Sequence, residues 1–168
     1  MSLLLCKNLY RGGGSRSAWL AAAVLLSLLF TPGAWGARVD KRLQGPVQAV
    51  VERVVDGDTL AVRARIWLGQ EIRVNVRIAR IDTPELSSRC PRERALADQA
   101  RELVQGILFA NTPSEPVVWL RDIDQDKYGG RVLARVSSGT GGDIAEALVA
   151  AGLAQSYSGG KRTDWCRI

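Results

Sequence analysis

The 168-residue chain contains no histidine, and aromatic residues make up only 6% of it. Without histidine the chain cannot build the serine–histidine or cysteine–histidine pairs of common hydrolases, nor a histidine-liganded metal site. Any catalysis must therefore use carboxylates, arginines, and a metal ion or water. Carboxylates hold hard cations or accept protons, and arginines bind phosphoryl oxygens.

Acidic residues are also missing from the first 36 positions, which carry three basic residues: Lys7, Arg11 and Arg16. An apolar run at 18–30 follows, and then Ala34-Trp35-Gly36, with small residues at its first and third positions. This order is typical of a secretory signal peptide that is cleaved before Ala37, and the run is short for a membrane span. We expect export to the periplasm or the medium, with no stable membrane insertion after cleavage. An uncleaved anchor and an organelle transit peptide are the alternatives.

Cysteine is scarce. Removal of residues 1–36 takes away Cys6 and leaves Cys90 and Cys166. An even count in an exported protein predicts a disulfide between them, and two free thiols are the alternative. The same removal lowers the formal net charge from +6 to +3, because the leader holds three basic and no acidic residues. This small excess of positive charge, most of which is carried by arginine, suits a polyanionic partner, although solvated surface explains most arginines equally well.

The hydrophobic pattern predicts an α+β protein that is mainly β. Alternating or β-branched residues predict five strands, at 47–55, 59–65, 71–79, 116–123 and 131–137. Helical spacing predicts helices at 92–109 and 144–151. This order favours a five-stranded OB-fold barrel with two or three packed helices, in a domain of residues 45–168.

Two acidic segments predict a metal site. Asp58 follows a tight turn, and we expect Asp82 at the end of the third strand. Two carboxylates and the backbone carbonyl of Thr83 are oxygen ligands that suit Ca²⁺ better than zinc or copper. Asp56 would not bind the metal directly but would hold a metal ligand or a metal-bound water. The alternative is that Asp56-Gly57-Asp58 only forms a turn, as such tripeptides usually do.

Charged residues near these acids predict phosphate chemistry. Arg77 and Arg131 could bind a phosphoryl group, and Glu85, which follows the strand-breaking Pro84, could activate water. An ion pair between Arg77 and a neighbouring acid is the alternative. Lys127 is expected to contact the nucleic-acid backbone.

Two tyrosines, Tyr128 and Tyr157, are candidate faces for bases. The alternatives are turn packing for Tyr128 and an ordinary loop aromatic for Tyr157.

Four ordered motifs resemble the staphylococcal nuclease family: Asp-Gly-Asp-Thr from Asp56, Arg-x4-Asp-Thr-Pro-Glu from Arg77, Asp-Lys-Tyr-Gly-Gly-Arg-x-Leu-Ala from Asp126, and Glu-Ala-Leu-Val-x2-Gly-Leu-Ala from Glu146. The resemblance covers residues 47–157. It implies an OB-fold and Ca²⁺-dependent hydrolysis of DNA and RNA that leaves 3′-phosphates. It also implies the metal, base and arginine roles assigned above, and nucleotide contacts for Lys127 and Tyr128.

The chain departs from the family pattern in two places. Gly129-Gly130 adds one glycine before Arg131, and we expect the turn to absorb it. The C-terminus is short where the founding member has a long helix, and a Cys90–Cys166 bridge could replace that helix.

We expect a monomer without an obligate protein partner. A non-catalytic nucleic-acid-binding domain and a signal-anchored nuclease are the competing interpretations.

Overall fold

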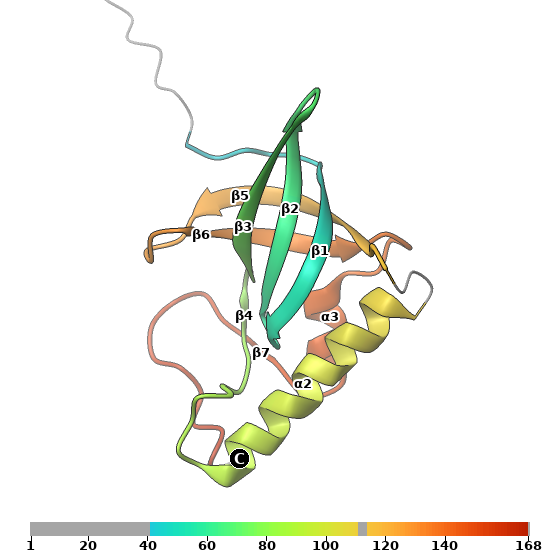
Figure 1. Cartoon of the computed structure of the whole chain (residues 1–168). Helices are drawn as coiled ribbons and strands as arrows, with labels where there is room; N and C mark the ends of the chain where they lie inside the picture. The colour runs from blue at the N-terminus through green and yellow to red at the C-terminus, as the bar shows by residue number, and fades with distance from the viewer. Residues whose placement is uncertain (1–40, 111–113, 168) are drawn as a thin grey trace, which may run out of the picture. The chain divides into compact units, whose positions relative to one another are not determined.

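The computed structural model describes residues 41–110 and 114–167, and its five long strands close into a barrel (Figure 1). The strands are β1 (Val47–Asp56), β2 (Thr59–Trp67), β3 (Gln70–Ile78), β5 (Val117–Gln125) and β6 (Arg131–Ser138). Their order around the barrel is β1-β2-β3-β6-β5, and only the β3–β6 pair is parallel. The predicted OB-fold is confirmed. The predicted signal peptide lies outside the described residues.

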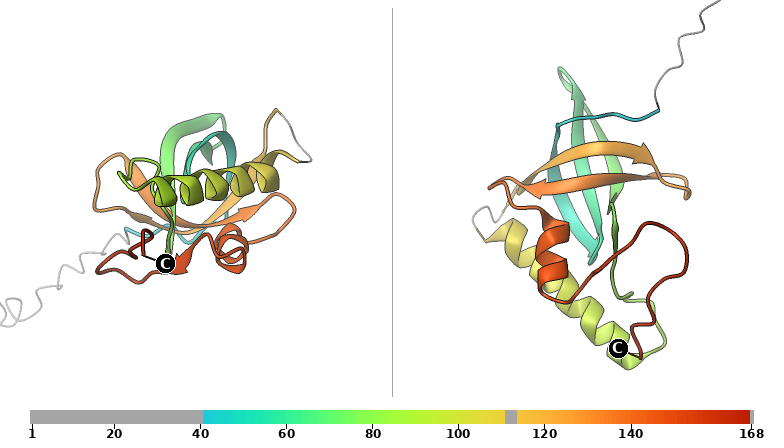
Figure 2. Two further views of the ribbon diagram at one scale, coloured as in Figure 1. Left: turned by 90° about the horizontal axis from the view of Figure 1, so that it is seen from below. Right: turned by 180° about the vertical axis from the view of Figure 1, so that it is seen from behind.

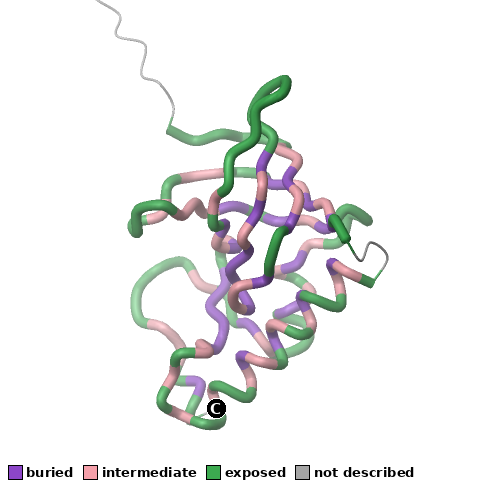
Figure 3. Tube along the Cα trace, in the orientation of Figure 1, coloured by how far each residue is buried: buried purple, intermediate pink, exposed green. Residues whose placement is uncertain are grey.

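Alternation along the strands builds the core. Side chains of one phase point into the barrel and those of the other phase face outward. The buried hydrophobic cluster is aliphatic, and Figure 3 shows buried residues in purple at the centre of the barrel. On three of the strands it includes Leu60, Val62, Val76, Ile78, Ala134 and Val136. The outward phase of β3 and β6 therefore keeps its arginines available for a site.

The β2–β3 hairpin extends beyond the barrel. Its tip exposes Trp67 at 70% and Leu68 at 88% of their surface. Ile72 continues the apolar alternation of Val74, Val76 and Ile78, but it is exposed because this end of the hairpin lies beyond the barrel. Among residues 41–110 and 114–167, no helix is both long enough and apolar enough to span a membrane.

Two helices pack against the barrel. The longer, α2 (Pro91–Phe109), crosses its lower end in the view of Figure 1 and in the view from below in Figure 2. It buries a stripe at helical spacing: Ala97, Ala100, Val104 and Leu108. The shorter, α3 (Ile144–Ala150), begins at Asp143, whose carboxylate accepts hydrogen bonds from two backbone amides of the first turn.

The prediction that Asp82 ends the third strand is wrong in detail. The β3 ladder stops at Ile78, and Arg80 takes a left-handed backbone conformation (φ 68°) that redirects the chain. Asp82 then lies in a separate two-residue strand, β4 (Ile81–Asp82), which pairs with β7 (Gln155–Ser156). This pairing brings the end of the chain beside the acidic segment.

The C-terminal loop, residues 157–166, returns from β7 to the start of α2 (Figures 1 and 2). Cys166 is joined there to Cys90 by a disulfide, with 6.3 Å between their Cα atoms. The loop is thus held at both ends, by the β4–β7 pairing and by the disulfide.

Candidate functional site

The turn between β1 and β2 carries the first acidic motif into a buried position. Only 2% of the surface of Asp58 is exposed, and its carboxylate accepts a hydrogen bond from the Thr59 hydroxyl at 2.8 Å. A Cβ atom built on Gly57 would lie 2.8 Å from the Cβ of Ala100 and 3.4 Å from that of Thr83. Because residue 57 is a glycine, this turn can pack closely against both α2 and the second acidic motif.

Asp56 lies at the edge of the same turn and is half-buried. Its carboxylate accepts a hydrogen bond from the Gly57 amide at 2.8 Å. Burial raises the pKa of Asp56 above its usual value, and the neighbouring Asp58 carboxylate adds to the rise; the Gly57 hydrogen bond and the charges of Arg162 and Arg77 oppose it. The surroundings of Asp56 therefore favour its protonated form more than water would.

Asp82 is the most enclosed carboxylate of the second motif, with 1% of its surface exposed. Arg162, from the C-terminal loop, donates from Nε to Asp82 Oδ1 at 2.6 Å and from Nη2 to the Thr83 carbonyl at 2.8 Å. Its Nη1 also pairs with Glu85. One guanidinium group therefore connects two of the predicted metal ligands with the predicted base.

The register of the sheet places two arginines on one face. In the parallel β3–β6 pair, Asn75 lies opposite Arg131 and Arg77 opposite Leu133. Because side chains two residues apart share a face, Arg77 and Arg131 both point outward on neighbouring strands. Arg77 Nη1 pairs with Asp58 at 2.7 Å, and Arg131 Nε pairs with Asp126 at 2.5 Å. The predicted alternative for Arg77, an ion pair with a nearby acid, is therefore what the structure contains.

A cavity of about 840 Å³ gathers most of the predicted residues. Its lining includes Arg77, Glu85, Lys127, Tyr128, Arg131 and Tyr157, and also Arg162. Their side chains come from β3, the segment after β4, the β5–β6 turn, β6 and the C-terminal loop. A cavity with these guanidinium groups, a carboxylate and two aromatic rings is suited to a phosphate-bearing ligand with rings.

The β5–β6 turn absorbs its extra glycine without disturbing the strand that follows. Gly130 adopts φ 80°, and β6 begins at Arg131 as expected. Lys127 Nζ lies 5.0 Å and Arg131 Cζ 5.2 Å from the centre of the Tyr128 ring, within the range of cation–π contact. The Tyr157 hydroxyl, by contrast, donates to the Gly160 carbonyl at 2.8 Å and helps to shape the C-terminal loop.

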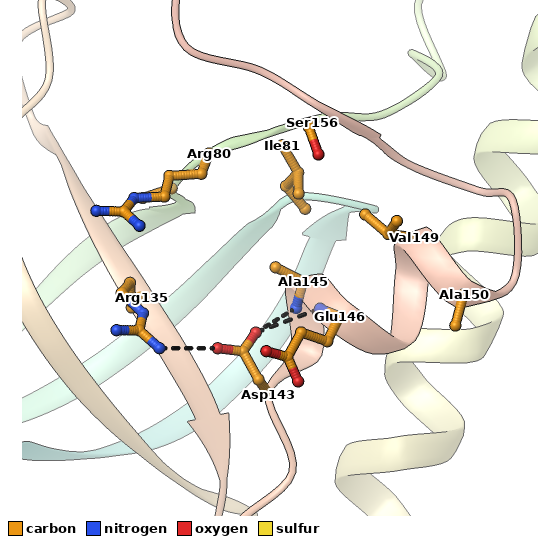
Figure 4. Close-up of a pocket in the computed structure, with 10 residues that line it drawn as sticks. Arg80, Ile81, Arg135, Asp143, Ala145, Glu146, Val149, Ala150 and Ser156 are labelled. Atoms are coloured by element: carbon orange, nitrogen blue, oxygen red, sulfur yellow. Dashed lines mark hydrogen bonds and ion pairs between the residues drawn. The ribbon is translucent and has the colours of Figure 1, made fainter.

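A second, smaller hollow of about 470 Å³ lies beside α3 (Figure 4). Arg80, Arg135 and Glu146 line it, and Arg135 pairs with the helix-capping Asp143 at 3.6 Å. None of the predicted site residues borders this hollow. The predicted catalytic and substrate-binding residues line the larger cavity, whereas Asp56, Asp58, Asp82 and Thr83 line neither.

The donor chemistry at the acidic motifs fits a hard cation. Asp58, Asp82 and the Thr83 carbonyl offer the oxygen ligands that Ca²⁺ prefers, and the Arg162 guanidinium already lies on two of them as a positive group. Within the described parts of the chain, no three Asp, Glu, His or Cys side chains are grouped so as to hold a metal ion. A carbonyl and water would therefore complete the set, and Arg162 would have to move.

Arg162 and its neighbours were not among the site residues predicted from the sequence. The Thr163 amide and the Trp165 indole N–H both donate to Asp82 Oδ2, at 3.1 and 3.3 Å. The predicted disulfide could have indicated this. It ties Cys166, four residues after Arg162, to Cys90, five residues after Glu85.

The barrel and the arginine-lined cavity define an OB-fold protein with a cavity whose lining suits a phosphate-bearing ligand. Residues 75–164, more than half of the chain, match the family model of staphylococcal nuclease homologues, and the chain belongs to this family. A comparison with curated proteins found no match. The matched stretch includes Arg77, Asp82, Glu85 and Arg131, whereas the Asp56–Asp58 turn precedes it.

Proposed function

We propose that the protein is an exported, Ca²⁺-dependent nuclease that hydrolyses DNA and RNA with little sequence specificity. The observation that carries the proposal is the single cavity in which Arg77, Arg131 and Glu85 meet, beside the buried carboxylates of Asp58 and Asp82. Fold alone would not support it, because OB barrels serve many functions. Membership of the nuclease family and the residues of the cavity support it together.

The two arginines bind the scissile phosphate in this proposal. Guanidinium groups form paired hydrogen bonds with phosphoryl oxygens, and they stabilise the negative charge that grows on those oxygens in the transition state. Arg77 and Arg131 now pair with Asp58 and Asp126, respectively. Asp126 holds the Arg131 guanidinium group on the cavity wall. Arg77 would have to exchange its pair with Asp58 for the phosphate when Asp58 binds Ca²⁺.

Glu85 is the proposed general base. Its side chain is 43% exposed and borders the cavity, so water can reach it. Glu85 would take a proton from a water molecule as the water oxygen bonds to phosphorus and the bond to the 5′ oxygen breaks. The 5′ oxygen then takes up a proton, and a 3′-phosphate remains. Ca²⁺ held by Asp58, Asp82 and the Thr83 carbonyl would supply positive charge to a phosphoryl oxygen.

Substrate binding would use the β5–β6 turn. Lys127 would contact the nucleic-acid backbone, and the exposed ring of Tyr128 would offer a stacking face that tolerates any base. The ring of Tyr157 borders the same cavity. Contacts to the backbone and to base faces carry no sequence code, which is consistent with low specificity.

Digestion of plasmid DNA and of RNA by the purified chain, in Ca²⁺ and in excess chelator, tests this proposal. We expect both substrates to be cut only in Ca²⁺. One observation favours a second function, a non-catalytic nucleic-acid-binding domain: Arg162 pairs with Asp82 and Glu85. A gel shift without cutting in either condition would support that function and refute the nuclease.

A further inference from the structure

We propose that the Arg162 guanidinium group occupies the position of the cation, and that a divalent ion must displace this group before it can bind. The inference rests on the proposed function, because it concerns the metal of the same site. Arg162, a residue of the C-terminal loop outside the predicted catalytic set, would thus compete with the divalent ion.

The contacts of Arg162 are those of a competing cation. Its guanidinium group touches a carboxylate oxygen of Asp82, the carbonyl oxygen of Thr83 and a carboxylate oxygen of Glu85. Two of these oxygens are the proposed ligands of Ca²⁺, and the third belongs to the proposed base. A guanidinium group and a divalent ion on the same oxygens repel each other and compete for the lone pairs, so binding of one disfavours the other.

The C-terminal loop is built to present this side chain. Gly159 and Gly160 adopt φ 103° and φ 100°, a conformation that favours glycine, and they turn the chain back toward Asp82. After Arg162, the Thr163 amide and the Trp165 indole N–H hold the other oxygen of Asp82. The loop therefore keeps an anchor on Asp82 Oδ2 that does not depend on the guanidinium group.

The guanidinium group can leave without unfolding the loop. The side chain of Arg162 is 37% exposed and borders the large cavity, so solvent screens its pairs and space is available for it. When the competent form of a site is only partly populated, the apparent affinity for its ligand falls by that fraction. If Arg162 occupies the position about nine tenths of the time, its removal strengthens Ca²⁺ binding about tenfold.

Calorimetric titration of the full chain with Ca²⁺ tests the proposal without a nuclease assay. Arg162→Gln should bind Ca²⁺ about tenfold more tightly than the wild type, in line with the occupancy above. Arg162→Lys keeps the charge, but it should also bind Ca²⁺ more tightly than the wild type. A lysine side chain lacks the fork that reaches Asp82 and Thr83 together. Arg167→Gln is the matched control: it removes the same charge from the same segment, and Arg167 pairs only with Asp164 among the described residues.

Nuclear magnetic resonance of the Arg162 Nε–H group supplies a second measurement. We expect the Nε proton to be protected from exchange with solvent in the ion-free protein, and to lose that protection as Ca²⁺ is added. Equal Ca²⁺ affinity in wild type, Arg162→Gln and Arg167→Gln would overturn the inference and leave the proposed function standing. Equal strengthening in both glutamine variants would reduce the effect to general charge and overturn it too. No Ca²⁺ binding by any of these proteins would contradict the proposed function itself.

Discussion

Replacement of Gly57 by alanine tests how closely the acidic β1–β2 turn approaches α2. The new Cβ atom would lie 2.8 Å from the Cβ of Ala100, whereas carbon atoms in contact prefer about 3.5–4.0 Å. Ala100 has no flexible end that could move aside, and it is fully buried in the helix interface. The turn, the helix or both must shift by several tenths of an ångström.

The expected loss of stability follows from two opposing effects. Overpacking of a dense core destabilises by about 1–3 kcal/mol. The loss of glycine from the unfolded chain returns about 0.4–1 kcal/mol, since no left-handed φ opposes alanine at this position. We expect a net loss of about 1–2 kcal/mol and a fall in Tm of roughly 4–8 °C for a domain of this size. Nuclease activity should fall as well, because the same turn carries Asp58.

Urea and thermal unfolding measure the change, and a second glycine provides the control. Gly106 lies exposed in the interior of α2, and a Cβ added there would meet no atom within 4 Å, so Gly106→Ala should stabilise by about 0.5–1 kcal/mol. Ala100→Gly should be less harmful in the Gly57→Ala background than alone, because it restores the missing space. If Gly57→Ala is as stable as the wild type, the close approach does not exist and the reasoning fails.

Three further predictions concern the cavity and the C-terminal loop. Arg77→Ala should lose activity and also about 3 kcal/mol of stability, because it leaves the buried carboxylate of Asp58 unpaired; normal stability by urea unfolding would contradict the pairing. Removal of the disulfide by Cys90→Ser with Cys166→Ser should destabilise by about 4–5 kcal/mol in the chain-entropy model, given the 76-residue separation, and an unchanged unfolding midpoint would show that the bond adds nothing. Tyr128→Ala should weaken binding of single-stranded DNA by about 1–3 kcal/mol in a fluorescence titration, and unchanged affinity would remove this ring from the interface.

The elements of the fold were predictable because their signals are local. The alternation through Val74, Val76 and Ile78 marks the barrel face of β3, and the predicted strands differ from the observed ones by one or two residues at their ends. Helical spacing likewise predicted a helix at 92–109, which is α2 in the structure. Ile72 follows the same alternation and is nevertheless exposed, because alternation alone does not reveal where a hairpin leaves the barrel.

The site was harder to predict because it depends on contacts between distant segments. The pairing of β4 with β7 joins Asp82 to Gln155, and no local pattern in either segment specifies that register. The loop that follows then carries Arg162 onto the acids. Local motifs identified the carboxylates and arginines of the site. The folded structure was needed to show which of these groups pair with one another.

The rate of plasmid cleavage by wild type and Glu85→Gln, compared in Ca²⁺ and in chelator, tests the central claim most directly. Glu85 is partly exposed, so the variant should fold normally, and circular dichroism verifies this. We predict cleavage by the wild type in Ca²⁺ alone, and a rate lower by about 10²–10⁴ for Glu85→Gln, the usual contribution of a general base. Cleavage at equal rates by the two proteins, or cleavage that persists in chelator, would contradict the account.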